Sequence, residues 1–218
     1  CTCFAPVASG VIYPQSFPNG RTCMRTGANG NSPTSTESVC WSGHLKNQVG
    51  AARERLGRSA CSTLLIVDAQ SVKNTDTAAL KGYDAGKKVS GIKRHIAVDT
   101  QGLPHAVTVT TAEVTDRQGA LQALQRCKSR LHGVRSLLCD SGYVGKPFAQ
   151  GAKDILGAHV GVQIAKRSEL HRFKVMPQRW IVERSFAWLE KNRRLWKNCE
   201  RLLNTSLQFV HLAFLALL

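Results

Sequence analysis

Two short apolar runs in the chain each end on an aspartate, and this repeated pattern constrains the fold most strongly. The first is STLLIVDAQSV at residues 62–72, which reaches Asp68; the second is SLLCDSGYVGKPF at 136–148, which reaches Asp140. A short apolar run without alternation is typical of a strand buried on both faces. Burying a carboxylate is costly, so an aspartate at a strand end needs a turn, a helix cap or a bound cation. Asp140-Ser-Gly is also a turn sequence by itself, so the structural alternative stays open.

The segments around these runs predict an α/β fold. Apolar alternation and a Gln-Gly turn indicate an antiparallel hairpin over residues 92–114. After the hairpin, segments with a helical spacing of apolar residues alternate with short strand patterns. This order predicts a mixed sheet flanked by helices. The expected helices cover residues 115–131, 146–159, 176–198 and 201–218, and the additional short strand covers 160–166.

The N-terminal part of the chain has a different composition from the rest. Residues 1–44 are rich in Gly, Ser, Thr, Asn and Pro without strand or helix periodicity, and they predict an irregular or disordered segment. Residues 45–59 are expected to form a helix, because Leu45, Val49 and Leu56 lie on one apolar face.

The charge of the chain indicates a polyanionic partner. There are 30 Lys and Arg residues against 14 Asp and Glu residues, which gives a formal net charge of +16. Such an excess favours nucleic-acid binding through neutralisation of phosphates and release of counterions. A basic protein without a charged partner is the alternative.

Cysteine usage, hydropathy and the motifs that are absent argue against several other classes of protein. The eight cysteines include no CxxC pair, which argues against a zinc site and indicates a reducing, intracellular compartment. The apolar stretch LQFVHLAFLALL at 207–218 is too short to span a bilayer. Phosphate-binding glycine loops and a GxSxG nucleophile turn are absent from the sequence.

Three acids stand out among the 14: Asp68, Asp140 and Glu183, the last within an aromatic helical stretch. An ion pair with Arg179, one helical turn earlier, or with Arg184 is the structural alternative for Glu183. Taken together, three carboxylates suit Mg²⁺, which prefers oxygen ligands. Two such ions about 4 Å apart can stabilise both the attacking and the leaving oxygen of a phosphodiester.

Four stretches of the sequence resemble the catalytic part of bacterial insertion-sequence transposases of the DDE type. The resemblance runs from about residue 60 to the end, and its glutamate helix fits the W-x-V-E-R-x-F-A-W subgroup. Those stretches are IVDAQSVKNT, GYDAGKKVSGIKRHIAVDTQGLPHAVTVTTAEVTDRQGA, LLCDSGYVG and RWIVERSFAWLEKNRRLWKNCER.

The resemblance implies a ribonuclease-H-like catalytic domain over residues 60–218, with Asp68, Asp140 and Glu183 as catalytic and metal-binding residues. It implies two Mg²⁺ ions, with Mn²⁺ as an alternative, and double-stranded DNA as partner, both element ends and target. The implied reaction is metal-dependent strand cleavage at insertion-sequence ends, followed by strand transfer into target DNA. It also implies a homodimer on DNA and a bacterial, cytoplasmic, nucleoid-associated location.

The glutamate helix keeps only part of the Y-x₂-R-x₃-E-x₆-K signature of related transposases. Arg179 and Glu183 match it, whereas Met176 and Glu190 stand at the tyrosine and lysine positions. Other basic side chains are therefore candidates for DNA contact. These candidates are Lys87, Lys88, Lys93, Arg94, Arg179, Arg184, Lys191, Arg193 and Arg194.

Three alternatives stay open. The N-terminal segment departs from the DNA-binding segment of the relatives, which a shifted reading frame before Leu45 would explain, so the copy is either active or truncated and inactive. A basic nucleic-acid-binding protein without catalysis would have the same charge. A ribonuclease-H-like nuclease would cleave strands but not join them.

Overall fold

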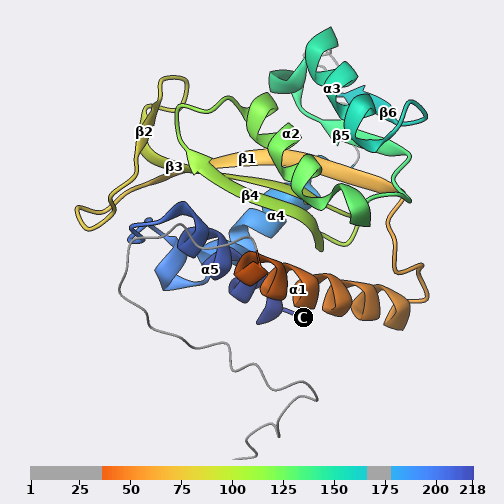
Figure 1. Cartoon of the computed structure of the whole chain (residues 1–218), viewed down its shortest axis with the longest axis horizontal. Helices are drawn as coiled ribbons and strands as arrows, with labels where there is room; N and C mark the ends of the chain where they lie inside the picture. Colours follow the sequence, from red (N-terminus) through yellow and green to blue (C-terminus); the bar gives the residue numbers. More distant parts are fainter. Residues whose placement is uncertain (1–35, 166–177) are drawn as a thin grey trace, which may run out of the picture. The chain divides into compact units, whose positions relative to one another are not determined.

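A six-stranded mixed sheet lies at the centre of the part of the chain that the computed structural model describes, residues 36–165 and 178–218 (Figure 1). The strand order is β2-β3-β1-β5-β6, and β4 pairs with β3. Strand β1 runs antiparallel to β3 and parallel to β5, which places it between the two halves of the sheet. The strands are β1 (Leu64–Lys73), β2 (Gly82–Asp84), β3 (Val89–Val98), β4 (Pro104–Thr111), β5 (Ser136–Cys139) and β6 (Gly161–Ile164).

Helices cover both faces of this sheet, so the predicted α/β fold, a mixed sheet flanked by helices, is confirmed. Helices α2 and α3 pack on one face, and α1, α4 and α5 pack on the other. No helix in the described residues is both long enough and apolar enough to cross a membrane. The helices are α1 (Thr36–Arg55), α2 (Asp116–Cys127), α3 (Lys146–Leu156), α4 (Arg179–Glu190) and α5 (Leu203–Leu215), with short 3₁₀ turns η1 (Lys128–Arg130), η2 (Ser141–Tyr143) and η4 (Arg193–Leu195).

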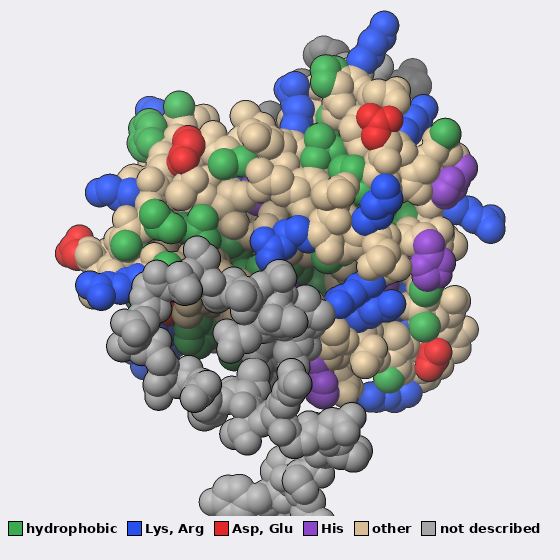
Figure 2. Space-filling model, viewed as in Figure 1, with side chains coloured by type: hydrophobic (Ala, Val, Ile, Leu, Met, Phe, Trp, Pro, Cys, Tyr) green, Lys and Arg blue, Asp and Glu red, His purple; other side chains and the backbone are tan. Residues whose placement is uncertain are grey.

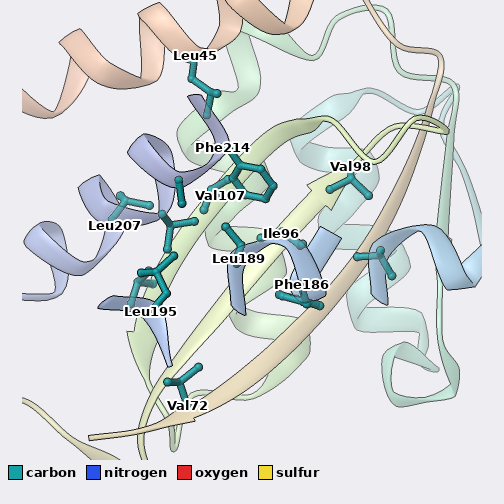
Figure 3. Close-up of a cluster of buried hydrophobic side chains, with 14 of the residues drawn as sticks. Leu45, Val72, Ile96, Val98, Val107, Phe186, Leu189, Leu195, Leu207 and Phe214 are labelled. Carbon is teal, nitrogen blue, oxygen red and sulfur yellow. The ribbon is translucent and has the colours of Figure 1, made fainter. Parts of the chain in front are cut away.

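Strand β1 contributes to a hydrophobic core on each face, as its apolar run predicts. Ile66 and Val72 belong to the hydrophobic cluster that also contains Phe186 and Leu189 of α4 on one side. Figure 3 labels Val72, Phe186 and Leu189 in this cluster. Leu65 and Val67 belong to the cluster under α2 and α3 on the other side. Because successive strand residues point to opposite faces, this alternation also fixes where the polar side chains of β1 point.

The expectation that Asp68 ends its strand is wrong, because β1 continues to Lys73. The parallel ladder with β5 stops at the pair Val67–Cys139. The antiparallel ladder with β3 continues to the pair Lys73–Gly91 and keeps the later part of β1 extended. Asp68 is therefore the first residue of β1 beyond the stretch paired with β5.

The expected long helix over 176–198 is also wrong, since α4 ends at Glu190. The side-chain amide of Asn192 donates to the backbone oxygens of Trp188 and Leu189, both at 3.3 Å, which caps the helix end. Trp196, which the expected helix would have included, is 63% exposed.

The first helix differs from the expected range of 45–59. Helix α1 begins at Thr36 and ends at Arg55, and Gly57 follows with a left-handed φ of 69°. Residues 36–44 are therefore helical rather than irregular, and residues 1–35 lie outside the described residues.

Candidate active site

The structure places Asp68 and Asp140 side by side. Each directly follows a member of the last β1–β5 pair, Val67–Cys139. In both strands the preceding alternation directs these two side chains to the face covered by α4. Both line a small cavity together with Arg179 and Val182 of α4.

Asp140 caps a turn with one carboxylate oxygen and faces Arg179 with the other. Its Oδ1 accepts a hydrogen bond from the backbone N–H of Gly142 at 2.9 Å, which caps η2. Its Oδ2 lies 3.5 Å from Nη2 of Arg179. The turn chemistry expected from Asp-Ser-Gly is thus present, but it uses only one carboxylate oxygen.

Asp68 has few partners for a largely buried carboxylate. Its Oδ1 accepts a hydrogen bond from the backbone N–H of Ala69 at 2.7 Å. Burial raises the pKa of Asp68 to about 6; the negative charge of Asp140 adds to this shift, and Arg179 and Lys87 oppose it. A carboxylate pair of this kind favours a bound cation, which would relieve both the burial and the repulsion.

Glu183 does not join the two aspartates directly. It lies on α4 with its side chain 61% exposed, and its Oε1 is 3.7 Å from Nε of Arg179. Arg179 also pairs with Asp140, so the guanidinium links the second aspartate to the glutamate. Within residues 42–165 and 178–218, no three His, Cys, Asp or Glu side chains are grouped as a metal site.

The residues present fit a divalent metal in part. Asp68 and Asp140 supply oxygen donors, which hard cations prefer, on one face of the sheet. The raised pKa of Asp68 reflects its burial first and the charge of Asp140 second, which the nearby Arg179 and Lys87 offset only in part. Glu183 would complete the donor set only after a change of its rotamer or of its pairing with Arg179.

Two of the predicted DNA-contacting residues are buried, which corrects that expectation. The ammonium of Lys93 lies 3.0 Å from Asp84 and 2.9 Å from Asp116, with the side chain 5% exposed. Arg94 is 2% exposed, and its Nη2 donates to the backbone oxygen of Leu195 at 2.7 Å. The charged groups of both side chains are held in contacts inside the protein, so neither can reach a DNA backbone in this conformation.

The remaining basic candidates lie nearer the surface. Lys87 and Lys88 are on the exposed β2–β3 turn, and Lys191, Arg193 and Arg194 follow α4. On the face shown in Figure 2, lysine and arginine side chains are spread over several elements rather than gathered on one. On this face, charge alone therefore does not identify a single DNA path.

Arg184 is held by aromatic rings. Its guanidinium lies 4.7 Å from the ring centroid of Trp180 and 4.8 Å from that of Trp188. Its Nη2 also donates to the backbone oxygen of Gln101 at 2.8 Å. These contacts give Arg184 a packing role in the described structure, and a DNA contact stays a prediction.

Sequence reasoning missed the partners that organise the site. Asp84 and Asp116 are not among the three acids that stand out in the sequence, yet both pair with buried Lys93. The available signal was Lys93 itself, a lysine in a strand segment that begins with Ile92 and returns to apolar residues at Ile96.

A family model described as "Transposase DDE domain" matches residues 59–218. A protein from Burkholderia cepacia, named "Putative transposase for insertion sequence element IS402", is 31% identical over 135 residues. The match covers 58% of this chain and 60% of that protein, so the chain spans about three-fifths of this relative's length.

Solved structures give weaker likenesses. One is "CryoEM structure of simian T-cell lymphotropic virus intasome in complex with PP2A regulatory subunit B56 gamma", with a TM-score of 0.47 and 14% identity over 71% of this chain and 47% of that chain. Another is "Mos1 transposase paired-end complex with left transposon end", with a TM-score of 0.30 and 13% identity over 90% and 63%.

Proposed function

The chain belongs to the transposase DDE domain family, and from this premise we propose that it catalyses metal-dependent strand cleavage at insertion-sequence ends and strand transfer into target DNA. The observation that carries the proposal is the pairing of Asp68 and Asp140 on one face of the sheet, next to Arg179. Both reactions are displacements at phosphorus, so a single carboxylate site can serve both.

The aspartates have the principal role in this proposal. Asp68 and Asp140 would hold Mg²⁺ or Mn²⁺, with Glu183 completing a second site. The chemistry that such ions supply when bound is Lewis-acid stabilisation of negative charge on the phosphodiester oxygens. The Ala69 and Gly142 amides fix one oxygen of each aspartate and leave the other without a backbone donor, and in Asp140 that second oxygen faces Arg179.

Arg179 would connect DNA binding with assembly of the site. Its guanidinium pairs with Asp140 and Glu183 in the described structure. A DNA phosphate is a strong bidentate partner for arginine. Transfer of Arg179 to a phosphate would release Glu183 toward the aspartates.

The DNA partner, the oligomeric state and the cellular location are part of the same proposal. The net charge of +16 would favour double-stranded DNA, with exposed Lys88, Lys191, Arg193 and Arg194 among the contacts. A homodimer would hold two element ends, and the protein would act at the bacterial nucleoid in the cytoplasm.

The test is Mg²⁺-dependent cleavage of a labelled duplex that carries an end of the element encoding this chain. Asp140→Asn should lower the cleavage rate at least about a thousand-fold, because one metal-holding carboxylate is lost. Salt-sensitive binding of the same duplex should persist. Asp154→Asn, on the exposed side of α3, is the matched control and should cleave as the unchanged protein does. Unimpaired cleavage by Asp140→Asn would remove Asp140 from the mechanism.

A DNA-binding protein without catalysis is the second candidate. The exposed position of Glu183 and its pairing with Arg179 favour it, since the three carboxylates do not meet. Failure of the unchanged protein to cleave with Mg²⁺ or Mn²⁺, despite salt-sensitive binding, would support it. Cleavage without joining of strands would instead indicate a nuclease.

A further inference from the structure

The turn between β2 and β3 is fixed by a carboxylate. Oδ1 of Asp84 accepts hydrogen bonds from the backbone N–H groups of Gly86 at 3.0 Å and Lys87 at 3.1 Å. Oδ2 of Asp84 accepts a hydrogen bond from the hydroxyl of Ser71 on β1 at 2.7 Å. The turn is therefore tied to β1, only a few residues beyond Asp68.

A buried lysine anchors this carboxylate in turn. Lys93 places its ammonium between Asp84 and Asp116 and donates a third hydrogen bond to the backbone oxygen of Val114 at 3.0 Å. Burial alone would lower the pKa of Lys93, but the two carboxylates outweigh it and raise the pKa. The turn thus rests on a fully paired ionic group rather than on a loose surface contact.

The result is a defined position for Lys87. Its ammonium donates to the backbone oxygen of Ala69 at 2.9 Å and lies 3.8 Å from Oδ2 of Asp116. Ala69 follows Asp68 and belongs to the part of β1 that β5 no longer covers. The Lys87 side chain is 44% exposed, so it stays accessible from solvent.

We propose that Lys87 is a catalytic residue that contacts the phosphodiester undergoing cleavage, and that Asp84 and Asp116 are positioning residues that hold its ammonium beside Asp68. The proposal rests on the proposed function and adds to it a cation of the chain itself at the reacting phosphate. An ammonium has three protons, and the Ala69 oxygen uses one of them, so donors remain for a phosphate oxygen.

The surrounding contacts distinguish Lys87 from a lysine that merely adds surface charge. Fixing both its backbone N–H and its ammonium lowers the cost of ordering a long, flexible side chain. A cation that is held in place before the reaction stabilises developing charge without reorganisation at the reacting step. General attraction of DNA needs no such fixing, because it acts through distance-dependent charge alone.

Helix α2 also connects this lysine with the second aspartate. Asp116, its first residue, faces Lys87, and Nε of the next residue, Arg117, donates to the backbone oxygen of Gly142 at 2.9 Å. Gly142 in turn donates to Asp140. One helical turn therefore supports the elements that present Lys87 and Asp140, which favours a shared site.

The experiment compares Lys87→Gln with Lys81→Gln in the full chain. Both substitutions remove one positive charge from a neighbouring stretch, and Lys81 is exposed just before β2. At saturating duplex and Mg²⁺, Lys87→Gln should lower the cleavage rate about a hundred-fold. Its affinity for the duplex should change no more than that of Lys81→Gln, which should cleave normally. Lys87→Arg, which keeps a positive donor, should recover part of the rate.

The outcomes separate this inference from the proposed function. If the unchanged protein cleaves, Asp140→Asn does not and Lys87→Gln cleaves at the normal rate, the role of Lys87 is overturned and the proposed function stands. An equal loss of affinity and rate would also overturn it, because Lys87 would then be a simple binding residue. If the unchanged protein does not cleave, both fail. Thermal unfolding of Lys87→Gln checks that the fold is kept, and the recovery by Lys87→Arg distinguishes catalysis from local packing.

Discussion

Two aspartates in this molecule occupy opposite electrostatic situations. Asp99, after β3, is fully buried, and its carboxylate accepts hydrogen bonds from Arg53 and from the backbone N–H groups of Gln101 and Leu103, with His105 at 3.3 Å. Burial alone would raise its pKa, yet these partners, His105 foremost, lower it. The pKa of Asp68 is instead raised to about 6, because burial and the neighbouring Asp140 exceed its few favourable partners.

The comparison separates an acid that stabilises the fold from one that is available for a ligand. Asp99 joins α1 to the β3–β4 connection through Arg53, and its oxygens are already occupied. Asp68 and Asp140 each keep an oxygen without a backbone donor. Active sites commonly retain such unfavourable charge at a cost in stability.

The largest effect on the free energy of unfolding is expected at Asp99, whose carboxylate oxygens all have partners. Arg53→Met should lower the free energy of unfolding by about 3–5 kcal/mol, because it removes the guanidinium that pairs with the buried Asp99 carboxylate. Chemical denaturation at neutral pH measures the change.

A matched control lies on the same helix. Arg55 is exposed in the last turn of α1, so Arg55→Met should change the free energy of unfolding by no more than about 0.5 kcal/mol. Equal effects of the two substitutions would show that the Arg53–Asp99 pair does not carry the predicted stability.

This satisfied site also shows where sequence reasoning stops. The apolar runs before Asp68 and Asp140 predict two strands of a mixed sheet, which the structure contains as β1 and β5, because a strand covered on both faces needs apolar residues at successive positions. By contrast, the sequence around Arg53 and Asp99 does not single out either residue. Their contact spans 46 residues and leaves no local pattern, so only the folded structure reveals it.

The same limit applies to the candidate active site. The i to i+4 spacing of Arg179 and Glu183 predicts their ion pair, which the structure contains. Contact of Arg179 with Asp140 depends on how α4 crosses the sheet, and no spacing encodes that. The burial of Lys93 likewise depends on two acids from separate elements.

An intermediate effect of opposite sign on the free energy of unfolding is expected at Asp68, whose carboxylate has few favourable partners. Asp68→Asn should raise the free energy of unfolding at neutral pH by about 1–3 kcal/mol, because it removes a buried charge and keeps an oxygen for the Ala69 amide. The same substitution should abolish Mg²⁺-dependent cleavage. A gain in stability with a loss of activity would be the signature of a functional acid.

The pH dependence of this stability gain tests independently whether the charge of Asp68 destabilises the fold. The pKa of Asp68 rises from 3.8 to about 6 on folding, so its ionisation destabilises the folded state. The gain from Asp68→Asn should therefore be absent below the unfolded pKa, grow as the pH rises through this interval and be complete above about pH 6. A gain that stayed constant from acid to neutral pH would assign the stabilisation to packing instead of charge.

The smallest effect is expected at an exposed pair, which tests whether burial or mere pairing matters. Nε of Arg194 donates to Oε1 of Glu200 at 2.8 Å, with the arginine side chain 57% exposed. Solvent screens such a pair, so a double-mutant cycle with Arg194→Gln and Glu200→Gln should give a coupling of about 0.2–1 kcal/mol that declines with added salt. A coupling as large as the loss in Arg53→Met would mean that pairing alone stabilises these acids. The distinction between Asp99 and Asp68 would then have to come from their partners and not from their burial.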